Sequence, residues 1–217
     1  DDYQTLSKQY IENSKIKSAK VADPACSISS GYSLENKVKN VPYKIGLGIG
    51  RATLFSDYGG TSSEREMLNF WGNLYKEFSK KGYQCILFTN GLPADYEMLS
   101  ELKEKLGTED VMAAERPQSV KELIDTITGF DAAVVTRLHS SIIAYSFGIP
   151  TVGLVWNEKQ KMFGEAIGHS ERFIREPFKV DSVIRLIEDA LMEKNEVDKE
   201  YCDTTRKEIQ YFLQQYF

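Results

Sequence analysis

The chain has 217 residues, of which 41% are hydrophobic and 12% aromatic, enough to build a packed core. Its 27 basic and 32 acidic residues are intermixed and give a formal net charge of −5, which argues against an electrostatic nucleic-acid surface. No stretch approaches the roughly 18 apolar residues that a membrane span requires, and the N-terminal residues do not have the pattern of a signal peptide.

The three cysteines, Cys26, Cys85 and Cys202, are odd in number, far apart in the sequence and not in metal-ligand spacing. We therefore expect free thiols in a reducing cytoplasm, with Cys85 inside a strand. The sequence offers no cluster of metal ligands, so neither a metal nor a resident cofactor is predicted.

The N-terminal region does not have the pattern of a complete domain. A helical period is set by Tyr3, Leu6, Tyr10 and Ile11. Because this period already includes the first residues and no initiator Met precedes it, we expect the chain to be a fragment of a longer protein. Residues 20–25 (KVADPA) predict a short extended segment that ends at an Asp-Pro turn, and residues 27–40 are typical of a polar linker. The compact domain is expected to begin at about Val41.

Residues 44–51 (KIGLGIGR) alternate apolar side chains with glycines, a period-2 strand pattern with one face bare of side chains. Something is expected to pack very close to that bare face. A dinucleotide fingerprint would require a third glycine where Arg51 stands, so a nicotinamide site is rejected. The next residues, 53–63, form a polar, glycine-rich loop that either faces an acceptor or is a plain surface loop.

Strands and helices then alternate. Capping-box patterns at Ser63-x-x-Glu66 and Ser119-x-x-Glu122 mark two helix starts, and Gly82 and Gly129 mark the two ends. The remaining elements are predicted as strands at 83–89, 111–114 and 173–174 and helices at 94–106, 181–193 and 197–217. An aromatic cluster in the last helix suggests a docking surface and comprises Tyr211, Phe212, Tyr216 and Phe217.

The most informative stretch runs from Asp131 to Phe163. An apolar run ends at Arg137, Leu138 and His139, which places a cation and an imidazole at the tip of a buried strand. Ser140 and Ser141 are expected to cap a short helix that Gly148 and Pro150 stop. A second apolar run, 151–156, ends at Asn157. Polar residues thus gather where an open α/β sheet binds its ligands, beyond the carboxyl ends of the strands.

Alternating strands and helices predict an α/β fold with a parallel sheet and right-handed crossovers, a Rossmann-like domain. We assign residues 1–40 to the remnant of a preceding N-terminal domain plus a linker and residues 41–178 to the Rossmann-like domain. Residues 179–217 are assigned to C-terminal helices that pack on this domain or on its missing partner.

A strand followed by Arg137-Leu138-His139, a helix of small residues, Gly148-Ile149-Pro150, and Asn157 with Lys159 resembles the C-terminal half of the polysaccharide pyruvyl transferase family. Other matching features are Asp23-Pro24-Ala25, Arg51, and the segment 88–91 (FTNG) with Asp95. The resemblance covers most of residues 20–175. It implies one Rossmann-like half of a two-domain enzyme of the GT-B type, with a catalytic cleft between the halves.

The resemblance also implies phosphoenolpyruvate as the donor and a glycan or lipid-linked saccharide as the acceptor, without a cofactor. Phosphoenolpyruvate carries a phosphate and a carboxylate, which guanidinium groups and helix-start amides bind well. Arg51 and Arg137 supply the guanidinium groups, and the helix start at Ser140 supplies the amides. An imidazole that titrates near neutral pH suits proton transfer, so His139 is the catalytic candidate. Leu138, Asn90 and Lys159 complete the expected substrate-binding set.

Structural alternatives stand beside these roles. Arg51 could cap its strand or pair with Asp57, Asn90 could only form a turn, and Lys159 could be a solvated helix residue. A histidine after a strand, as His139 is, is often a structural hydrogen-bonding residue. His169, in a Gly-His-Ser turn, is assigned a structural role.

Two other functions remain open. The chain could be the donor-binding half of a nucleotide-sugar glycosyltransferase, for which Glu158 is the one acidic candidate for the ribose, or a non-catalytic anion-binding domain. For the leading function, exopolysaccharide assembly in the cytoplasm or at the membrane periphery is expected. The acceptor sugar is not encoded in a recognisable motif.

Overall fold

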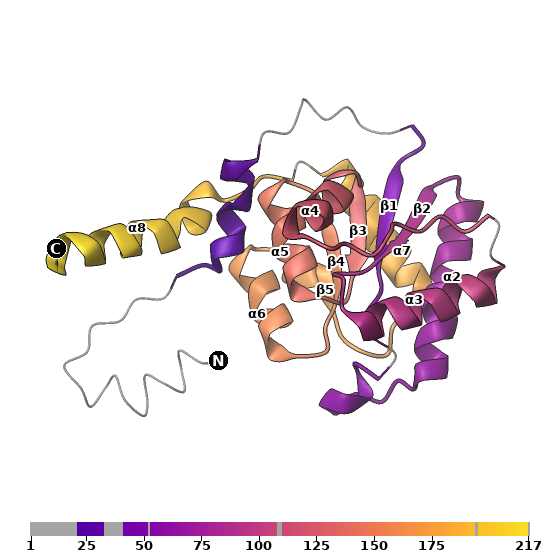
Figure 1. Ribbon diagram of the computed structural model, residues 1–217. Helices are drawn as coiled ribbons and strands as arrows, with labels where there is room; N and C mark the ends of the chain where they lie inside the picture. The colour runs from indigo at the N-terminus through magenta and orange to yellow at the C-terminus, as the bar shows by residue number, and fades with distance from the viewer. Residues whose placement is uncertain (1–20, 33–40, 52, 108–109, 194, 217) are drawn as a thin grey trace.

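The computed structural model describes residues 21–32, 41–51, 53–107, 110–193 and 195–216 (Figure 1). The helix expected over Tyr3 to Ile11 and residues 33–40 of the expected linker lie outside the described residues. Among the described helices, none is long and apolar enough to cross a membrane.

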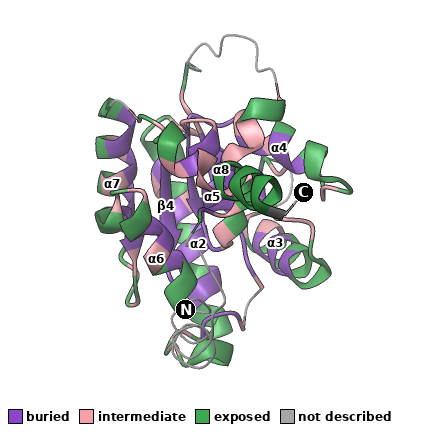
Figure 2. Cartoon of the chain, turned by 90° about the vertical axis from the view of Figure 1, so that its left-hand side faces the viewer, coloured by how far each residue is buried: buried purple, intermediate pink, exposed green. Residues whose placement is uncertain are grey.

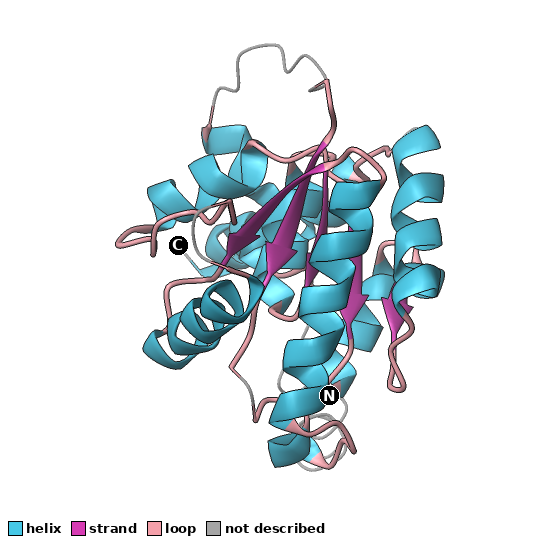
Figure 3. Cartoon of the chain, turned by 90° about the vertical axis from the view of Figure 1, so that its right-hand side faces the viewer, coloured by secondary structure: helices cyan, strands magenta, loops and turns pink. Residues whose placement is uncertain are grey.

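Five parallel strands form one sheet in the order β2-β1-β3-β4-β5. The arrowheads in Figure 3 all point the same way, so the carboxyl ends of the strands share one edge of the sheet. The chain adds β2 on one side of β1 and then crosses to place β3 on the other side. The point where the strand order reverses therefore lies between β1 and β3. The strands are β1 (Lys44–Gly48), β2 (Gln84–Phe88), β3 (Ala132–Val135), β4 (Thr151–Leu154) and β5 (Phe173–Ile174).

Helices cover both faces of this sheet. Alternate residues of β3 point to opposite faces: Ala132 and Val134 join the core under α2, α3 and α7, while Ala133 and Val135 join the core under α4 and α5. The helices are α2 (Glu64–Lys80), α3 (Pro93–Leu106), α4 (Val120–Thr128), α5 (Leu138–Ser146), α6 (Glu158–Ala166), α7 (Val180–Met192) and α8 (Lys199–Tyr216). The short 3₁₀ helices are η2 (Pro24–Gly31), η3 (Ser56–Tyr58) and η4 (Ser170–Arg172).

Most elements expected from the sequence are present. The capping box at Ser63 is confirmed, and Ser119 also caps its helix, but Glu122 accepts from the Gln118 amide where a complete box would use the Ser119 amide. The strand predicted at 111–114 is reduced to a single parallel bridge between Ala113 and Leu87 at the sheet edge. Two backbone hydrogen bonds around Leu87 are all that this segment exchanges with β2, which is too few for a ladder.

The close approach to the bare face of β1 is confirmed. A Cβ on Gly46 would lie 2.3 Å from the ring of Phe130, and one on Gly48 would lie 2.9 Å from the ring of Phe88. The two phenylalanine rings are themselves packed together, with centroids 5.1 Å apart. The glycines are therefore required by volume, because a buried aromatic layer occupies the space of their side chains.

A Gly46→Ala variant is expected to lose about 1–3 kcal/mol of unfolding free energy, because the added methyl overlaps the buried Phe130 ring. Gly72→Ala is the matched control. Its new Cβ would sit in the interior of α2 at ordinary contact distances of 3.7 and 3.8 Å from Leu102 and Leu106. Gly72→Ala should gain about 0.5–1 kcal/mol from the helix preference of alanine. Urea unfolding of both variants measures the contrast, and equal effects would contradict the packing described for β1.

The N-terminal described segment packs on the domain. Residues 24–31 form η2, which lies against α5 and α8 and includes residues 27–31 of the predicted linker. The linker prediction is therefore wrong for residues 27–31. Cys26 is buried there, in the same cluster as Cys202 of α8. The polar composition of residues 27–40 favoured a linker. Apolar contacts of η2 with α5 and α8 stabilise a helical segment there in spite of that composition.

The C-terminal helices differ from one another. α7 contributes Val183, Ile184 and Ile187 to the main core. α8 extends away from the body and is largely exposed beyond its first turns (Figures 1 and 2). Tyr211 and Phe212 are more than half exposed, and Phe217 lies outside the described residues. The division of the chain at residues 40 and 178 stays a prediction.

All three cysteines are free and buried, and Cys85 lies in β2 as predicted. Burial raises the pKa of Cys26 and Cys85 to about 12 and raises that of Cys202 as well. At pH 8 only about one thiol in 10⁴ with such a pKa is ionised. We expect iodoacetamide to leave the native chain unmodified at pH 8 and to alkylate all three thiols in urea, as intact mass would record. Rapid labelling of the native chain would contradict the described burial.

Candidate functional site

A groove of about 840 Å³ lies at the carboxyl edge of the sheet. It is built from the segments that follow β2, β3 and β4, from η2, and from the start of α4. Five of the seven residues expected at the site line it: Asn90, Arg137, Leu138, His139 and Lys159. The other two residues do not line the groove themselves. Ser140 is hydrogen-bonded to Asn90, which does, and Arg51 is ion-paired with Asp57, the residue next to Tyr58 of the groove.

Arg137 is fixed by a buried carboxylate. Its Nε and Nη2 atoms donate to the two oxygens of Asp95, at 2.8 and 2.5 Å, and Asp95 in α3 is fully buried. A two-point contact of this kind fixes the plane of a guanidinium group. Asp95 thus occupies the edge of the guanidinium group that carries Nε and Nη2. The described residues provide no hydrogen-bond partner for Nη1. Arg137 can therefore present Nη1 and the second hydrogen of Nη2 to an anion.

Arg51 follows β1 and reaches the same aspartate through its main chain. Its backbone N–H donates to Asp95 at 2.8 Å, while its guanidinium turns away to Asp57 at 2.7 Å. Hydrogen bonds from Thr53 and from Arg51 lower the pKa of Asp57. The ion pair with Asp57 is the alternative recognised from the sequence, and the ligand role of Arg51 stays a prediction.

His139 lies in the first turn of α5 and is exposed, with 64% of its side chain accessible. Its Nε2 is 3.8 Å from the Asp23 carboxylate, which also caps η2 by accepting the Ala25 amide. Asp23 and His139 are 116 positions apart, so sequence periodicity could not pair them. The Asp23 carboxylate thus lies within ion-pair distance of the imidazole.

Ser140 and Ser141 do not cap α5, so this prediction is wrong. The helix begins at Leu138, and Arg137 is its N-cap residue without a side-chain capping bond. The Arg137 carbonyl already accepts from the amides of Ser140 and Ser141, which places both serines inside the first turn. The buried Ser140 hydroxyl donates to the Asn90 side chain and so positions Asn90 at the groove.

The far wall of the groove comes from the end of β4 and the start of α6. Asn157 caps α6 by accepting the Gln160 amide, and Lys159 lies exposed in its first turn. Glu158, the residue considered for a nucleotide ribose, is ion-paired with Arg175. Its carboxylate is therefore already committed to a neighbouring cation.

Three residues at this edge of the sheet were not assigned a role from the sequence, namely Asp95, Tyr58 and Trp156. Asp95 was noted in the sequence only as part of a recurrent segment, and nothing in its helical context signals a buried charge. Tyr58 of η3 and Trp156 after β4 line the groove together, with ring centroids 4.6 Å apart. Each follows a loop or strand end in the sequence, but no periodic pattern joins them.

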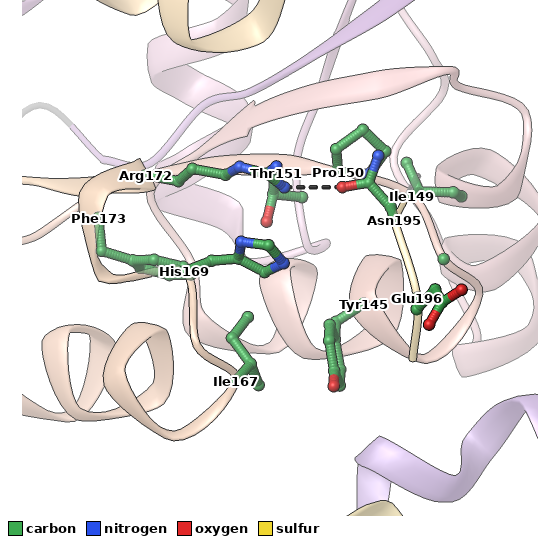
Figure 4. Close-up of a pocket in the computed structure, with 11 residues that line it drawn as sticks. Tyr145, Ile149, Pro150, Thr151, Ile167, His169, Arg172, Phe173, Asn195 and Glu196 are labelled. Atoms are coloured by element: carbon green, nitrogen blue, oxygen red, sulfur yellow. Dashed lines mark hydrogen bonds between the residues drawn. The ribbon is translucent and has the colours of Figure 1, made fainter. Parts of the chain in front are cut away.

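His169 lies at the opposite edge of the sheet, beside a cavity of about 20 Å³ (Figure 4). Arg172 spans this cavity to Asn195 with a hydrogen bond of 2.7 Å, drawn as a dashed line. The volume is close to that of one water molecule and excludes a substrate. His169 itself contacts Glu171 at 3.3 Å. Neither edge, within the described part of the chain, gathers three potential metal ligands.

Similarity to a known protein family covers most of the chain. The family model for polysaccharide pyruvyl transferase matches residues 4–158. No significant relative was found among curated proteins.

The UDP-GlcNAc 2-epimerase of Methanocaldococcus jannaschii, solved with UDP-GlcNAc and UDP, is similar in structure with a TM-score of 0.56 at 14% identity. The match covers 79% of this chain and 45% of that one. A family 9 glycosyl transferase from Veillonella parvula gives a TM-score of 0.48 at 18% identity, over 80% of this chain and 53% of that one. The chain thus spans about half the length of these structures. The expected fold class is confirmed: a parallel α/β sheet flanked by helices, like one domain of a GT-B-type enzyme.

Proposed function

Because the chain belongs to the polysaccharide pyruvyl transferase family, we propose that it binds phosphoenolpyruvate and helps transfer the pyruvyl group to two hydroxyls of a glycan as a ketal. The acceptor is a polysaccharide or its lipid-linked precursor, and further acceptor contacts come from a preceding domain of the same protein. Three free, buried thiols fit a reducing cytoplasm, where we place the reaction, at or near the membrane on which glycans are assembled.

The observation that carries this function is the half-occupied guanidinium of Arg137. Asp95 holds one edge of the fork, so the other edge is oriented in advance toward the groove. A phosphate or carboxylate group matches that edge with two parallel hydrogen bonds. The amides at the start of α5 add donors and a favourable dipole beside it.

The reaction needs proton transfer at three points. Protonation of the enol methylene of phosphoenolpyruvate gives a cation at its C2, which the first sugar hydroxyl attacks with loss of a proton. Breaking the C2–O bond releases phosphate, and the second hydroxyl then attacks C2 and loses its proton. Phosphoenolpyruvate and a diol thus become a ketal and inorganic phosphate. His139 is suited to deliver or receive these protons, and the Asp23 carboxylate lies 3.8 Å from its Nε2.

Calorimetric titration with phosphoenolpyruvate, with a UDP-sugar and with buffer tests this assignment. We expect phosphoenolpyruvate to bind. An Arg137→Lys variant should bind it roughly tenfold to a hundredfold more weakly, because lysine keeps the charge opposite Asp95 but loses the fork. Arg175→Lys, outside the groove and paired with Glu158, is the matched control.

Two results would count against the proposal. Unchanged affinity of Arg137→Lys for phosphoenolpyruvate would remove Arg137 from the site. Binding of the UDP-sugar in the absence of phosphoenolpyruvate binding would instead favour the nucleotide-sugar alternative.

A further inference from the structure

Two aromatic side chains that the proposed chemistry does not use face the groove. Tyr58 is 57% exposed although it is large and mostly apolar. Its ring packs at 60° against Trp156, and both rings line the same cavity as Arg137 and His139. An exposed aromatic pair beside a polar site is a common feature of ligand pockets.

Trp156 is held rigidly. Its indole Nε1 donates to the Thr136 carbonyl at 2.7 Å, and the buried Gln160 side chain donates to the same oxygen at 2.9 Å. The only polar atom of the indole is therefore satisfied inside the protein. The part of the Trp156 ring that faces the groove is therefore carbon surface.

The loop that carries Tyr58 is also anchored. Asp57 is bound by Arg51 and Thr53, so the ion pair of Arg51 fixes the residue next to Tyr58. At the other end of the loop, the Glu176 carboxylate accepts the amides of Thr61 and Ser62 at 2.9 and 2.8 Å. These contacts hold Tyr58 in its exposed position against Trp156 and so reduce the entropy lost when a ligand binds.

We propose that Tyr58 and Trp156 form a stacking surface for one pyranose ring of the acceptor glycan. One face of a pyranose ring consists of C–H groups that pack against the electron-rich face of an aromatic ring. Its hydroxyls project from the rim, where Asn157 and Lys159 provide hydrogen-bonding groups in the same cavity. Phosphoenolpyruvate carries a phosphate and a carboxylate and has no face of C–H groups, so this surface suits the acceptor and not the donor.

Naming this sugar as the acceptor rests on the proposed function, whereas the stacking surface itself rests on the geometry of Tyr58 and Trp156. The chain has two tryptophans, and Trp71 is buried in the core with 1% exposure. A Trp71→Phe background therefore leaves Trp156 as the single tryptophan, whose emission can be excited selectively over that of tyrosine. If that variant does not fold, difference spectra of the unaltered chain give the same reading, because a buried Trp71 contributes a constant background.

The experiment is a fluorescence titration with the methyl glycosides of glucose, galactose and N-acetylglucosamine up to about 100 mM, where even a millimolar site is saturated. At least one glycoside should change the Trp156 emission saturably. Tyr58→Ala should weaken that binding roughly tenfold and leave phosphoenolpyruvate affinity unchanged. Tyr211→Ala is the matched control, since Tyr211 is 54% exposed on α8.

The absence of any saturable response, or equal sugar affinities of Tyr58→Ala and Tyr211→Ala, would overturn the stacking surface. Binding of a glycoside that depends on Tyr58 in a chain that does not bind phosphoenolpyruvate would support the stacking surface while refuting the proposed donor. The failures of the two proposals are thus distinguishable.

Discussion

Replacing Arg137 with alanine is expected to lower the free energy of unfolding by about 3–5 kcal/mol, because it leaves the charge of Asp95 buried without its partner. Among the residues that the structure describes, only the amide of Arg51 would still donate to that carboxylate. Urea unfolding followed by circular dichroism measures the loss. An alanine variant that bound phosphoenolpyruvate poorly would therefore be ambiguous, which is why Arg137→Lys is the better test of binding.

Arg51→Ala is the matched control for this expectation. Arg51 also forms an ion pair with an aspartate, but both partners are partly exposed, with 33% and 44% of their side chains accessible. Water can solvate Asp57 when its partner is removed, so the loss of stability should be far smaller. If the two alanine variants lose similar stability, burial of Asp95 is not the cause. A double variant that also replaces Asp95 with alanine should recover part of the loss seen for Arg137→Ala.

Replacing His139 with alanine is expected to reduce pyruvyl transfer by about 10²–10⁴-fold in the protein that carries both halves of the enzyme. Release of inorganic phosphate from phosphoenolpyruvate in the presence of acceptor measures the rate. Stability should change little, because 64% of the side chain is exposed and its charged contact within the described part of the chain is the 3.8 Å approach to Asp23. Phosphoenolpyruvate affinity should also persist, since Arg137 remains in place.

The chain has two histidines, which gives this experiment an internal control. His169→Ala alters the imidazole at the opposite edge of the sheet, beside a cavity that fits about one water molecule. Transfer should proceed at the normal rate in His169→Ala. Unchanged transfer in His139→Ala, or an equal loss in both variants, would remove His139 from the proton-transfer role.

The sequence by itself determined the α/β architecture and the edge at which the site lies. Glycines on one face of β1 required a close neighbour, and Ser63 with Glu66 specified a helix start from local hydrogen bonding alone. Arg137 and His139 follow a strand directly, so a parallel sheet had to bring them to its carboxyl edge. These features depend on residues near one another in the chain, where period and capping chemistry are decisive.

Only the tertiary structure decided which side chains pair at that edge. Asp95 lies 42 positions before Arg137 and binds it, and Asp23 approaches His139 from outside the sheet. Tyr58 meets Trp156 in the same way. Such contacts depend on how loops fold over strand ends, and neither residue of a pair carries a periodic signal of its partner. A charge such as that of Asp95 is buried because the folded chain supplies its hydrogen bonds, and those donors are brought together only when the sheet has formed.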